Sequence, residues 1–207
     1  MTTLPDAVVA AARERRFLLG VVGVPGSGKS TLAAALAAGA PADLHARVVP
    51  MDGFHLSGAS LAERGLADRK GAPETFDGAA FAALLGRLRL EDGVVMAPAY
   101  SRALHEPVAD ACEVPAECRL VVVEGNYLEL WPEVRALLDE VWFLEVPWAV
   151  ARERLIARHV AGGRTVADAA AWVDRVDAAN AVLVEGARGE QRSVPSGEPG
   201  ASAKTRE

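Results

Sequence analysis

Apolar residues recur along the chain in two patterns, as short continuous runs and as longer stretches with one apolar face. The short runs are typical of strands buried in a parallel sheet, and they lie at residues 17–22, 47–51, 94–97, 119–124 and 140–146. The longer stretches repeat at the spacing of an α-helix, and they lie at residues 7–16, 31–38, 57–64, 78–90, 131–138, 148–160 and 165–184. Because strands alternate with helices, we expect a three-layer α/β fold with a parallel central sheet and helices on both of its faces.

The composition indicates one domain followed by a tail. The chain has 207 residues, an ordinary length for one domain, and 51% of them are hydrophobic, which is enough for a buried core. From residue 186 onward glycine, proline, serine and charged residues dominate, and no apolar period survives. We therefore expect a single domain over residues 1–188 and a disordered tail over residues 189–207.

Charge and targeting signals narrow the class of protein. The formal net charge of −6 argues against non-specific binding of nucleic acid. The N-terminus lacks a basic region followed by an apolar run, and no apolar stretch is long enough to span a bilayer, so we expect a cytoplasmic protein with no membrane partner. The two cysteines, Cys112 and Cys118, are expected to be reduced thiols rather than zinc ligands. The sequence leaves the oligomeric state open, a homodimer included.

A glycine-rich segment, residues 23–30, lies between the first predicted strand and the next helix, and it matches the pattern of glycine, four free positions, glycine, lysine and serine. Its glycines can adopt positive φ and bring backbone N–H groups close to an anion at the start of the helix. Lys29 is then expected to reach the β- and γ-phosphates of a nucleotide, and Ser30 to help hold Mg²⁺. The alternative is a glycine-rich turn with a chance Lys-Ser pair, and the flanking strand and helix argue against it. The predicted nucleotide-binding residues here are Gly23, Pro25, Gly26, Ser27, Gly28, Lys29, Ser30 and Thr31.

Two acidic residues follow predicted strands, Asp52 after the second and Glu124 at the end of the central one. The carboxyl ends of parallel strands face a ligand crevice, so we expect Lys29, Asp52 and Glu124 around one crevice. Asp52 is a candidate base for an acceptor hydroxyl, which is worth about 10²–10⁴-fold in rate; otherwise it is a turn residue before Gly53. Glu124 is a candidate ligand of Mg²⁺ through water, or an acceptor for Lys29 or Ser30, or merely the end of a strand.

Arginines gather on and just beyond the predicted helix at residues 148–160. Arg154 and Arg158 are four positions apart and share a helix face, and Arg164 follows the helix. Neighbouring guanidinium groups on one face could clamp transferring phosphates. A solvated face paired with Glu153 and other acids explains the same pattern.

Further segments follow the glycine-rich one in a fixed order, namely Met51-Asp52-Gly53-Phe54-His55, Arg64-Gly65-Leu66, Lys70-Gly71-Ala72-Pro73-Glu74-Thr75-Phe76-Asp77, Ala97-Pro98-Ala99-Tyr100-Ser101 and Glu124-Gly125-Asn126. Together they resemble the P-loop kinase superfamily of uridine kinase, phosphoribulokinase and bacterial pantothenate kinase. The Arg-Gly-Leu and Lys-Gly-x-Pro-Glu segments are most similar to pantothenate kinase. The resemblance covers roughly residues 17–164, and it implies the P-loop NTPase fold, ATP and Mg²⁺.

The resemblance also implies roles by position. Asp52 matches the catalytic aspartate of the family, and Glu124 matches the acid after the central strand. The lid of the family corresponds to about residues 152–165, and its arginines meet ATP. Tyr100 and His105 match the substrate-side loop of uridine kinase. The implied residues are, for catalysis, Asp52, Lys29 and Arg158; for ATP, Arg154 and Arg164 with the glycine-rich segment; for substrate, His55, Lys70, Tyr100, Arg102, His105 and Asn126; and for the metal, Ser30 and Glu124.

Departures from the family concern the acceptor. Pantothenate kinase usually has a histidine where this chain has Arg102, and aromatic residues make up only 5% of the chain. Arg102 fits an anionic or polyhydroxylated acceptor, or it pairs with Glu106. We therefore predict an ATP-dependent kinase that phosphorylates a hydroxyl of a small metabolite, such as a nucleoside, a sugar or pantothenate. The alternative is a nucleotide-binding ATPase or switch module without an acceptor.

Overall fold

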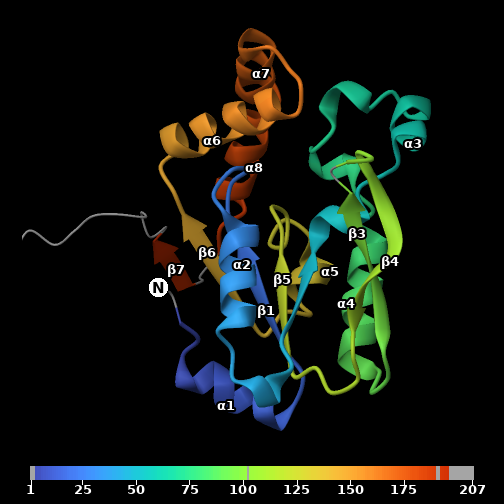
Figure 1. The fold of residues 1–207 in the computed structure, drawn as a ribbon, viewed down its shortest axis with the longest axis vertical. Coiled ribbons are helices and arrows are strands. Elements are labelled where there is room, and N and C mark those ends of the chain that lie inside the picture. The colour runs from blue at the N-terminus through green and yellow to red at the C-terminus, as the bar shows by residue number, and fades with distance from the viewer. Residues whose placement is uncertain (1–2, 102, 190–191, 196–207) are drawn as a thin grey trace, which may run out of the picture.

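The computed structural model describes residues 3–101, 103–189 and 192–195. Its centre is a sheet of five parallel strands in the order β2-β5-β1-β6-β7 (Figure 1). Both β1 and β5 are buried along their whole length, as expected of apolar runs covered on both faces. The strand bounds are β1 (Phe17–Val22), β2 (Arg47–Pro50), β5 (Leu120–Glu124), β6 (Glu140–Glu145) and β7 (Arg192–Pro195).

Helices cover both faces of the sheet, which confirms the predicted three-layer α/β fold. On one face α1 (Asp6–Glu14) and α2 (Lys29–Ala38) contribute buried residues to a core shared with β1 and β5. On the other face the core includes buried residues of α4 (Gly78–Leu90) and of the short α5 (Pro132–Arg135). The apolar stripe predicted at residues 78–90 is therefore buried, through Phe81, Leu84, Leu85 and Leu88.

A two-stranded antiparallel sheet lies apart from the central one and consists of β3 (Val95–Ser101) and β4 (Glu106–Val114). The strand predicted at residues 94–97 exists, but it is not part of the parallel sheet. The sequence predicts no strand over the residues of β4. Since most of β4 is exposed, it lacks the apolar run that identifies a strand in the sequence.

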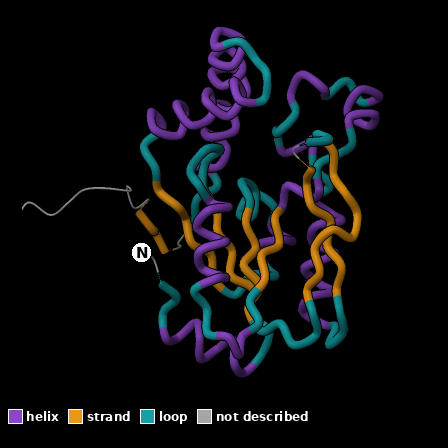
Figure 2. The backbone as a smooth tube through the Cα atoms, viewed as in Figure 1, coloured by secondary structure: helices purple, strands orange, loops and turns teal. Residues whose placement is uncertain are grey.

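The carboxyl ends of the central strands lie below a group of helices, which we call the lid helices (Figures 1 and 2). They are α6 (Trp148–Ala161), α7 (Val166–Trp172), a π-helix (Val173–Asp177) and α8 (Ala178–Gly186). The sequence predicted one helix over residues 165–184, whereas a π-helical segment separates α7 from α8. Thr165 caps the start of α7, because its Oγ1 accepts the backbone N–H of Asp168 at 3.1 Å.

Short helices lie beside the upper ends of β3 and β4, across from the lid helices (Figure 1). They include α3 (Gly58–Glu63) and the 3₁₀-helices Met51–Phe54, Ala67–Arg69 and Pro73–Thr75. A further 3₁₀-helix, Ala42–Leu44, precedes β2.

The last described strand falls within the segment for which the sequence predicts disorder. Strand β7 pairs in parallel with β6, and Val194 is buried in the same core as α1 and α2. Four residues with one buried apolar side chain give no periodic signal, which is why the sequence did not reveal this strand. Residues 196–207 of the predicted tail lie outside the described residues. The described part of the chain contains no helix long and apolar enough to cross a bilayer.

Candidate active site

The glycine-rich segment forms a tight loop between β1 and α2. Gly26 and Gly28 have φ of 77° and 99°, a conformation that favours glycine, and Gly28 precedes the first residue of α2. Lys29 begins the helix and is buried, and its Nζ donates a hydrogen bond to the Val24 carbonyl at 3.0 Å. The loop therefore folds around its own lysine at the start of a helix, as anion-binding loops require.

Helix α6 packs directly against this loop. A Cβ atom on Gly26 would lie 2.6 Å from the Ala151 carbonyl oxygen and 2.8 Å from Leu155 Cγ, so only glycine fits there. Arg154 Nη1 donates to the Ser27 carbonyl at 3.2 Å. Helix α6 therefore contacts the glycine-rich loop. Arg154, which the sequence analysis assigns to ATP together with this loop, lies against it.

The loop also has the features of a site for a phosphate chain. Ser27 Oγ is buried and has no hydrogen-bond partner in the part of the chain that the structure describes. Buried hydroxyl groups without a hydrogen-bond partner are rare in proteins, so a bound ligand is a natural partner for this one. A Cβ atom on Gly28 would have one neighbour within 4 Å among the described residues, Arg154 Nη1 at 3.9 Å. The space beside the Gly28 backbone is therefore free for a ligand that Arg154 can reach. A bound phosphate fits both observations.

Lys29 is coupled electrostatically to the other predicted catalytic groups. Burial lowers its pKa from 10.5 to about 8, while Glu124 and Asp52 oppose this shift and Arg158 adds to it. The structure places Glu124 beside this part of the loop, because it accepts a hydrogen bond from Ser30, the residue after Lys29. Asp52 occupies the 3₁₀-helix directly after β2.

Sheet register explains how Asp52 and Glu124 come together. Glu124 pairs with Val21 of β1 on one side and with Pro50 of β2 on the other. A Cβ atom on Gly125 would lie 2.5 Å from Met51 Cβ, so the ends of β2 and β5 touch. The Glu124 carboxylate accepts a hydrogen bond from Ser30 Oγ at 3.0 Å.

The Ser30 and Glu124 pair is the part of the site that fits a magnesium ion. Mg²⁺ commonly takes one or two protein ligands and completes its shell with phosphates and water. Among residues 3–101, 103–189 and 192–195 there is no group of three or more His, Cys, Asp or Glu arranged to hold a metal. The donor set is therefore suited to a metal bound together with a nucleotide rather than to a permanent metal centre.

Four predicted substrate residues form one cluster beside Asp52. His55 Nδ1 lies 2.9 Å from the Asp52 carbonyl, and the His55 and Tyr100 rings are 4.8 Å apart. Lys70 Nζ lies 5.3 Å from the centre of the Tyr100 ring and donates to the His105 carbonyl at 2.9 Å. Burial lowers the pKa of His55, although Asp52 opposes this, so burial favours the neutral form of the ring.

Of the two other predicted substrate residues, Asn126 lies two positions after the end of β5. Arg102 lies outside the described residues.

Known proteins resemble this chain over most of its length. No protein-family model matches it. The Schizosaccharomyces pombe protein named "Putative uridine kinase C227.14" is 36% identical over 194 residues, covering 86% of this chain and 82% of that protein. Pantothenate kinase of Corynebacterium diphtheriae is 36% identical over 120 residues, covering 56% of this chain and 39% of that enzyme. A crystal structure named "putative fructose transport system kinase" from Silicibacter sp. TM1040 has a TM-score of 0.82 and 41% identity, covering 90% of this chain and 96% of that chain.

This chain belongs to the P-loop kinase superfamily of uridine kinase and pantothenate kinase. The resemblance read from the sequence motifs is thereby confirmed, and so is the P-loop NTPase fold. Since these relatives are named as kinases of small molecules, the chain is a small-molecule P-loop kinase that uses a nucleotide.

The lid arginines of this kinase differ in their surroundings. The positive charge of Arg158 contributes to the lowered pKa of Lys29. The Arg164 guanidinium instead lies 4.1 Å from the centre of the Trp172 ring. Arg152 forms an exposed ion pair with Asp174 at 2.7 Å. The arginine-rich helix is therefore partly a solvated face and partly a wall of the site.

Two residues of the kinase site were not predicted from the sequence. Tyr127 and Asn180 are buried, and both donate hydrogen bonds to the Gly71 carbonyl, at 2.5 and 3.1 Å. They fasten the segment that carries Lys70 to the end of β5 and to α8. Asn180 faces inward, since it is buried and its amide contacts the backbone of Gly71.

Proposed function

We propose that this kinase transfers the γ-phosphoryl group of ATP to a hydroxyl group of a small metabolite. The observation that carries the proposal is the pairing of β2 with β5, since Pro50 lies opposite Glu124, Asp52 follows two residues later, and Glu124 accepts a hydrogen bond from Ser30 of the phosphate loop. A kinase that acts on an alcohol needs a carboxylate beside the terminal phosphate, and a simple nucleotide switch does not.

In this proposal the loop and its lysine hold the donor. ATP supplies the phosphoryl group, and Mg²⁺ neutralises part of its charge, when both are bound. Backbone N–H groups of the loop and the Lys29 ammonium bind phosphate oxygens, and Ser30 and Glu124 hold the metal, directly or through water. Arg154 and Arg158 stabilise the charge on the transferring group from the lid side.

Asp52 and its neighbours handle the acceptor. The Asp52 carboxylate orients the acceptor hydroxyl and accepts its proton. Since His55 Nδ1 faces the Asp52 carbonyl, that nitrogen carries the ring proton and Nε2 is left as a hydrogen-bond acceptor. Lys70, Tyr100 and His105 form the adjoining wall. A nucleoside, a sugar and pantothenate are the acceptor classes that this arrangement leaves open.

A coupled ADP-release screen over these acceptors tests the proposal, with Asp52→Asn as the decisive variant. We expect the variant to lose about 10²–10⁴-fold in acceptor-dependent turnover, because the hydroxyl proton has no carboxylate to receive it. Its affinity for ATP should change little. Asp92→Asn, at an exposed position, serves as the matched control.

A nucleotide switch without an acceptor would give a different result. ADP release would then be the same with and without each acceptor, and Asp52→Asn would leave it nearly unchanged. That pair of results would refute the transfer to a hydroxyl.

A further inference from the structure

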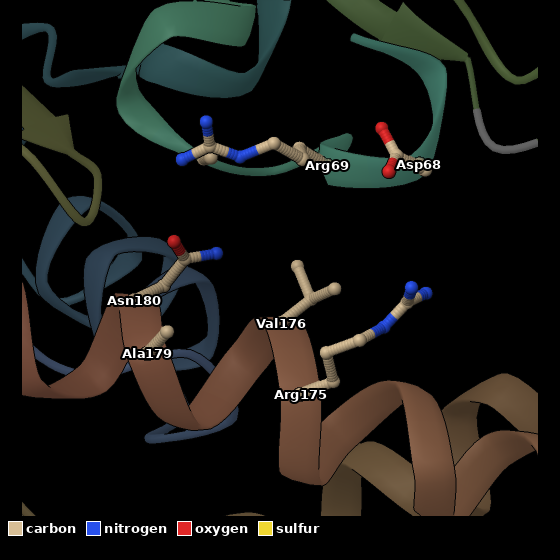
Figure 3. A pocket seen from close by; sticks show the side chains of 7 residues that line it. Asp68, Arg69, Arg175, Val176, Ala179 and Asn180 are labelled. Carbon is tan, nitrogen blue, oxygen red and sulfur yellow. The ribbon is translucent and has the colours of Figure 1, made fainter.

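A cavity of about 250 Å³ lies between the 3₁₀-helix Ala67–Arg69 and the lid helices (Figure 3). In Figure 3 the Arg69 guanidinium faces the Asn180 amide at one end, and Asp68 and Arg175 lie at the other. The cavity adjoins the proposed acceptor cluster, because Asn180 binds the Gly71 carbonyl and the neighbouring Lys70 holds His105. Its volume is below the roughly 300–1,000 Å³ of a pocket for a whole drug-sized ligand, so it suits one end of a small molecule.

The charges around this cavity are balanced. Arg69 is already paired, since its Nη2 lies 2.6 Å from Glu74 Oε1. Arg175 lies at the same end as Asp68, and its guanidinium is 5.4 Å from the centre of the Trp172 ring. No ion pair joins Arg175 to Asp68 in the described residues, but the Asp68 carboxylate lowers the positive potential at that end of the cavity. A carboxylate or phosphate entering the cavity would compete with Glu74 for Arg69 and would meet the Asp68 carboxylate. Recognition of an anion usually relies on guanidinium groups whose charge is not already matched.

Asn180 gives the cavity a fixed hydrogen-bond acceptor. Its Nδ2 donates to the Gly71 carbonyl at 3.1 Å, and this bond decides which way the amide is turned. The side-chain carbonyl, which makes no other hydrogen bond with the described residues, is left to accept from a ligand. An acceptor oxygen attracts a hydroxyl and repels the oxygens of a carboxylate or phosphate.

The remaining wall of the cavity is apolar and consists of Ala72, Val176 and Ala179. A sugar ring or polyol chain has this same combination, with C–H groups on one side and hydroxyls on the other. We propose that the cavity binds an uncharged, hydroxyl-rich part of the acceptor, so that the kinase selects a sugar, polyol or nucleoside over an acid or phosphate ester. The inference rests on the proposed function, because the cavity is assigned to the acceptor of that transfer.

Ligand-observed saturation-transfer NMR on the full chain tests the inference without turnover. The probes are matched pairs, glucitol with gluconate and ribose with ribose 5-phosphate, and uridine separates a nucleoside from a free sugar. We expect each neutral probe to bind at least about tenfold more tightly than its acidic partner, equivalent to about 1.4 kcal/mol. Binding of uridine alone assigns the cavity to a ribose with its base attached, and binding of ribose or glucitol assigns it to a free sugar or polyol.

Two variants tie the selectivity to this cavity. Asn180→Leu should weaken neutral probes about tenfold, and Val182→Ala, at an exposed position of the same helix, should not. Asp68→Asn keeps the hydrogen-bonding oxygen and removes the negative charge, so it should improve binding of the acidic probes about fivefold. Because Asp68 is exposed on a short 3₁₀-helix, this variant does not depend on tolerance of the lid to mutation.

The outcomes separate the inference from the proposed function. Tighter binding of gluconate or ribose 5-phosphate to the unaltered chain overturns the inference, as does the absence of binding by any neutral probe. If an acid drives ADP release that depends on Asp52, the transfer to a hydroxyl stands and the inference falls. If neutral probes bind with the expected variant pattern but accept no phosphoryl group, the cavity assignment stands and the transfer falls.

Discussion

The Ser30 hydroxyl donates a hydrogen bond to Oε1 of Glu124 at 3.0 Å, although 94 positions separate the two residues in the sequence. This contact joins the first turn of α2 to the carboxyl end of β5. A hydroxyl and a carboxylate are both hard oxygen donors, and such donors suit Mg²⁺. The contact therefore holds the two predicted metal ligands together before a nucleotide arrives.

Replacing Glu124 with glutamine should weaken the use of Mg²⁺ selectively. The amide keeps an oxygen for Ser30 but removes the charge, so we expect the Mg²⁺ concentration for half-maximal ADP formation to rise by about 10–100-fold. Nucleotide binding measured in EDTA at pH 6, where the Lys29 ammonium stays charged, should change less than about twofold, because the backbone N–H groups of the loop are unaltered. Glu117→Gln, at an exposed position, is the control. An unchanged Mg²⁺ requirement would remove Glu124 from the metal site.

The fold was predictable where burial leaves a sequence pattern. Strands β1 and β5 are continuous apolar runs because both faces of the sheet are covered. Strand β4 is mostly exposed and β7 has four residues, so neither interrupts the surrounding pattern of polar residues. The π-helical segment between α7 and α8 has the same apolar spacing as a helix, and the break is invisible in the sequence.

The site was predictable where backbone geometry demands particular residues. Gly26 and Gly28 need positive φ, and these requirements appear as a motif. Tyr127 and Asn180 both hold the backbone carbonyl of Gly71 through hydrogen bonds. A residue of any type at position 71 would present the same carbonyl oxygen. Such a partner has no signature in a single sequence.

Nucleotide affinity should fall as the pH rises past about 8. In the unliganded chain burial lowers the pKa of Lys29 to about 8, so above that pH the side chain is neutral and phosphate binding must draw a proton from solution. The apparent affinity then drops by up to about tenfold per pH unit, and it is flat below pH 7. Calorimetric titration at pH 7 and pH 9, in buffers of different ionisation enthalpy, measures both affinity and proton uptake.

The matched variant for this prediction is Lys29→Arg. Arginine keeps its charge throughout this range, so the drop in affinity above pH 8 should disappear even if binding is weaker overall. A drop of equal size in both proteins would assign the titration to another group.

Two glycine substitutions should act in opposite directions. Gly26→Ala places a methyl group 2.6 Å from the Ala151 carbonyl oxygen at φ of 77°, so we expect a loss of about 2–4 kcal/mol in unfolding free energy and weak nucleotide binding. Gly86→Ala in α4 meets no atom within 4 Å and should add up to about 1 kcal/mol. Urea denaturation followed by circular dichroism gives both values. Equal effects would mean that α6 does not press on the loop.

Asp139 links three parts of the fold at the end opposite the site, and its loss should destabilise the chain in a pH-dependent way. It accepts the Leu18 backbone N–H at 2.8 Å and pairs with Arg15 at 2.6 Å and Arg89 at 2.7 Å. Burial by itself raises the pKa of Asp139, but hydrogen bonds from Arg15, the Leu18 N–H and Arg89 together hold it below its ordinary value.

Because the folded-state pKa of Asp139 is lowered, its contribution is complete above the unfolded pKa of about 3.9 and is lost as the pH falls through the folded value. We expect Asp139→Asn to cost about 2–3 kcal/mol at pH 7. The difference from the unaltered chain should shrink progressively below pH 4, as the aspartate itself becomes neutral. Asp43→Asn, which breaks an exposed pair with Arg13, should leave the urea midpoint unchanged at every pH. If the two variants behaved alike, Asp139 would be no more than another surface charge.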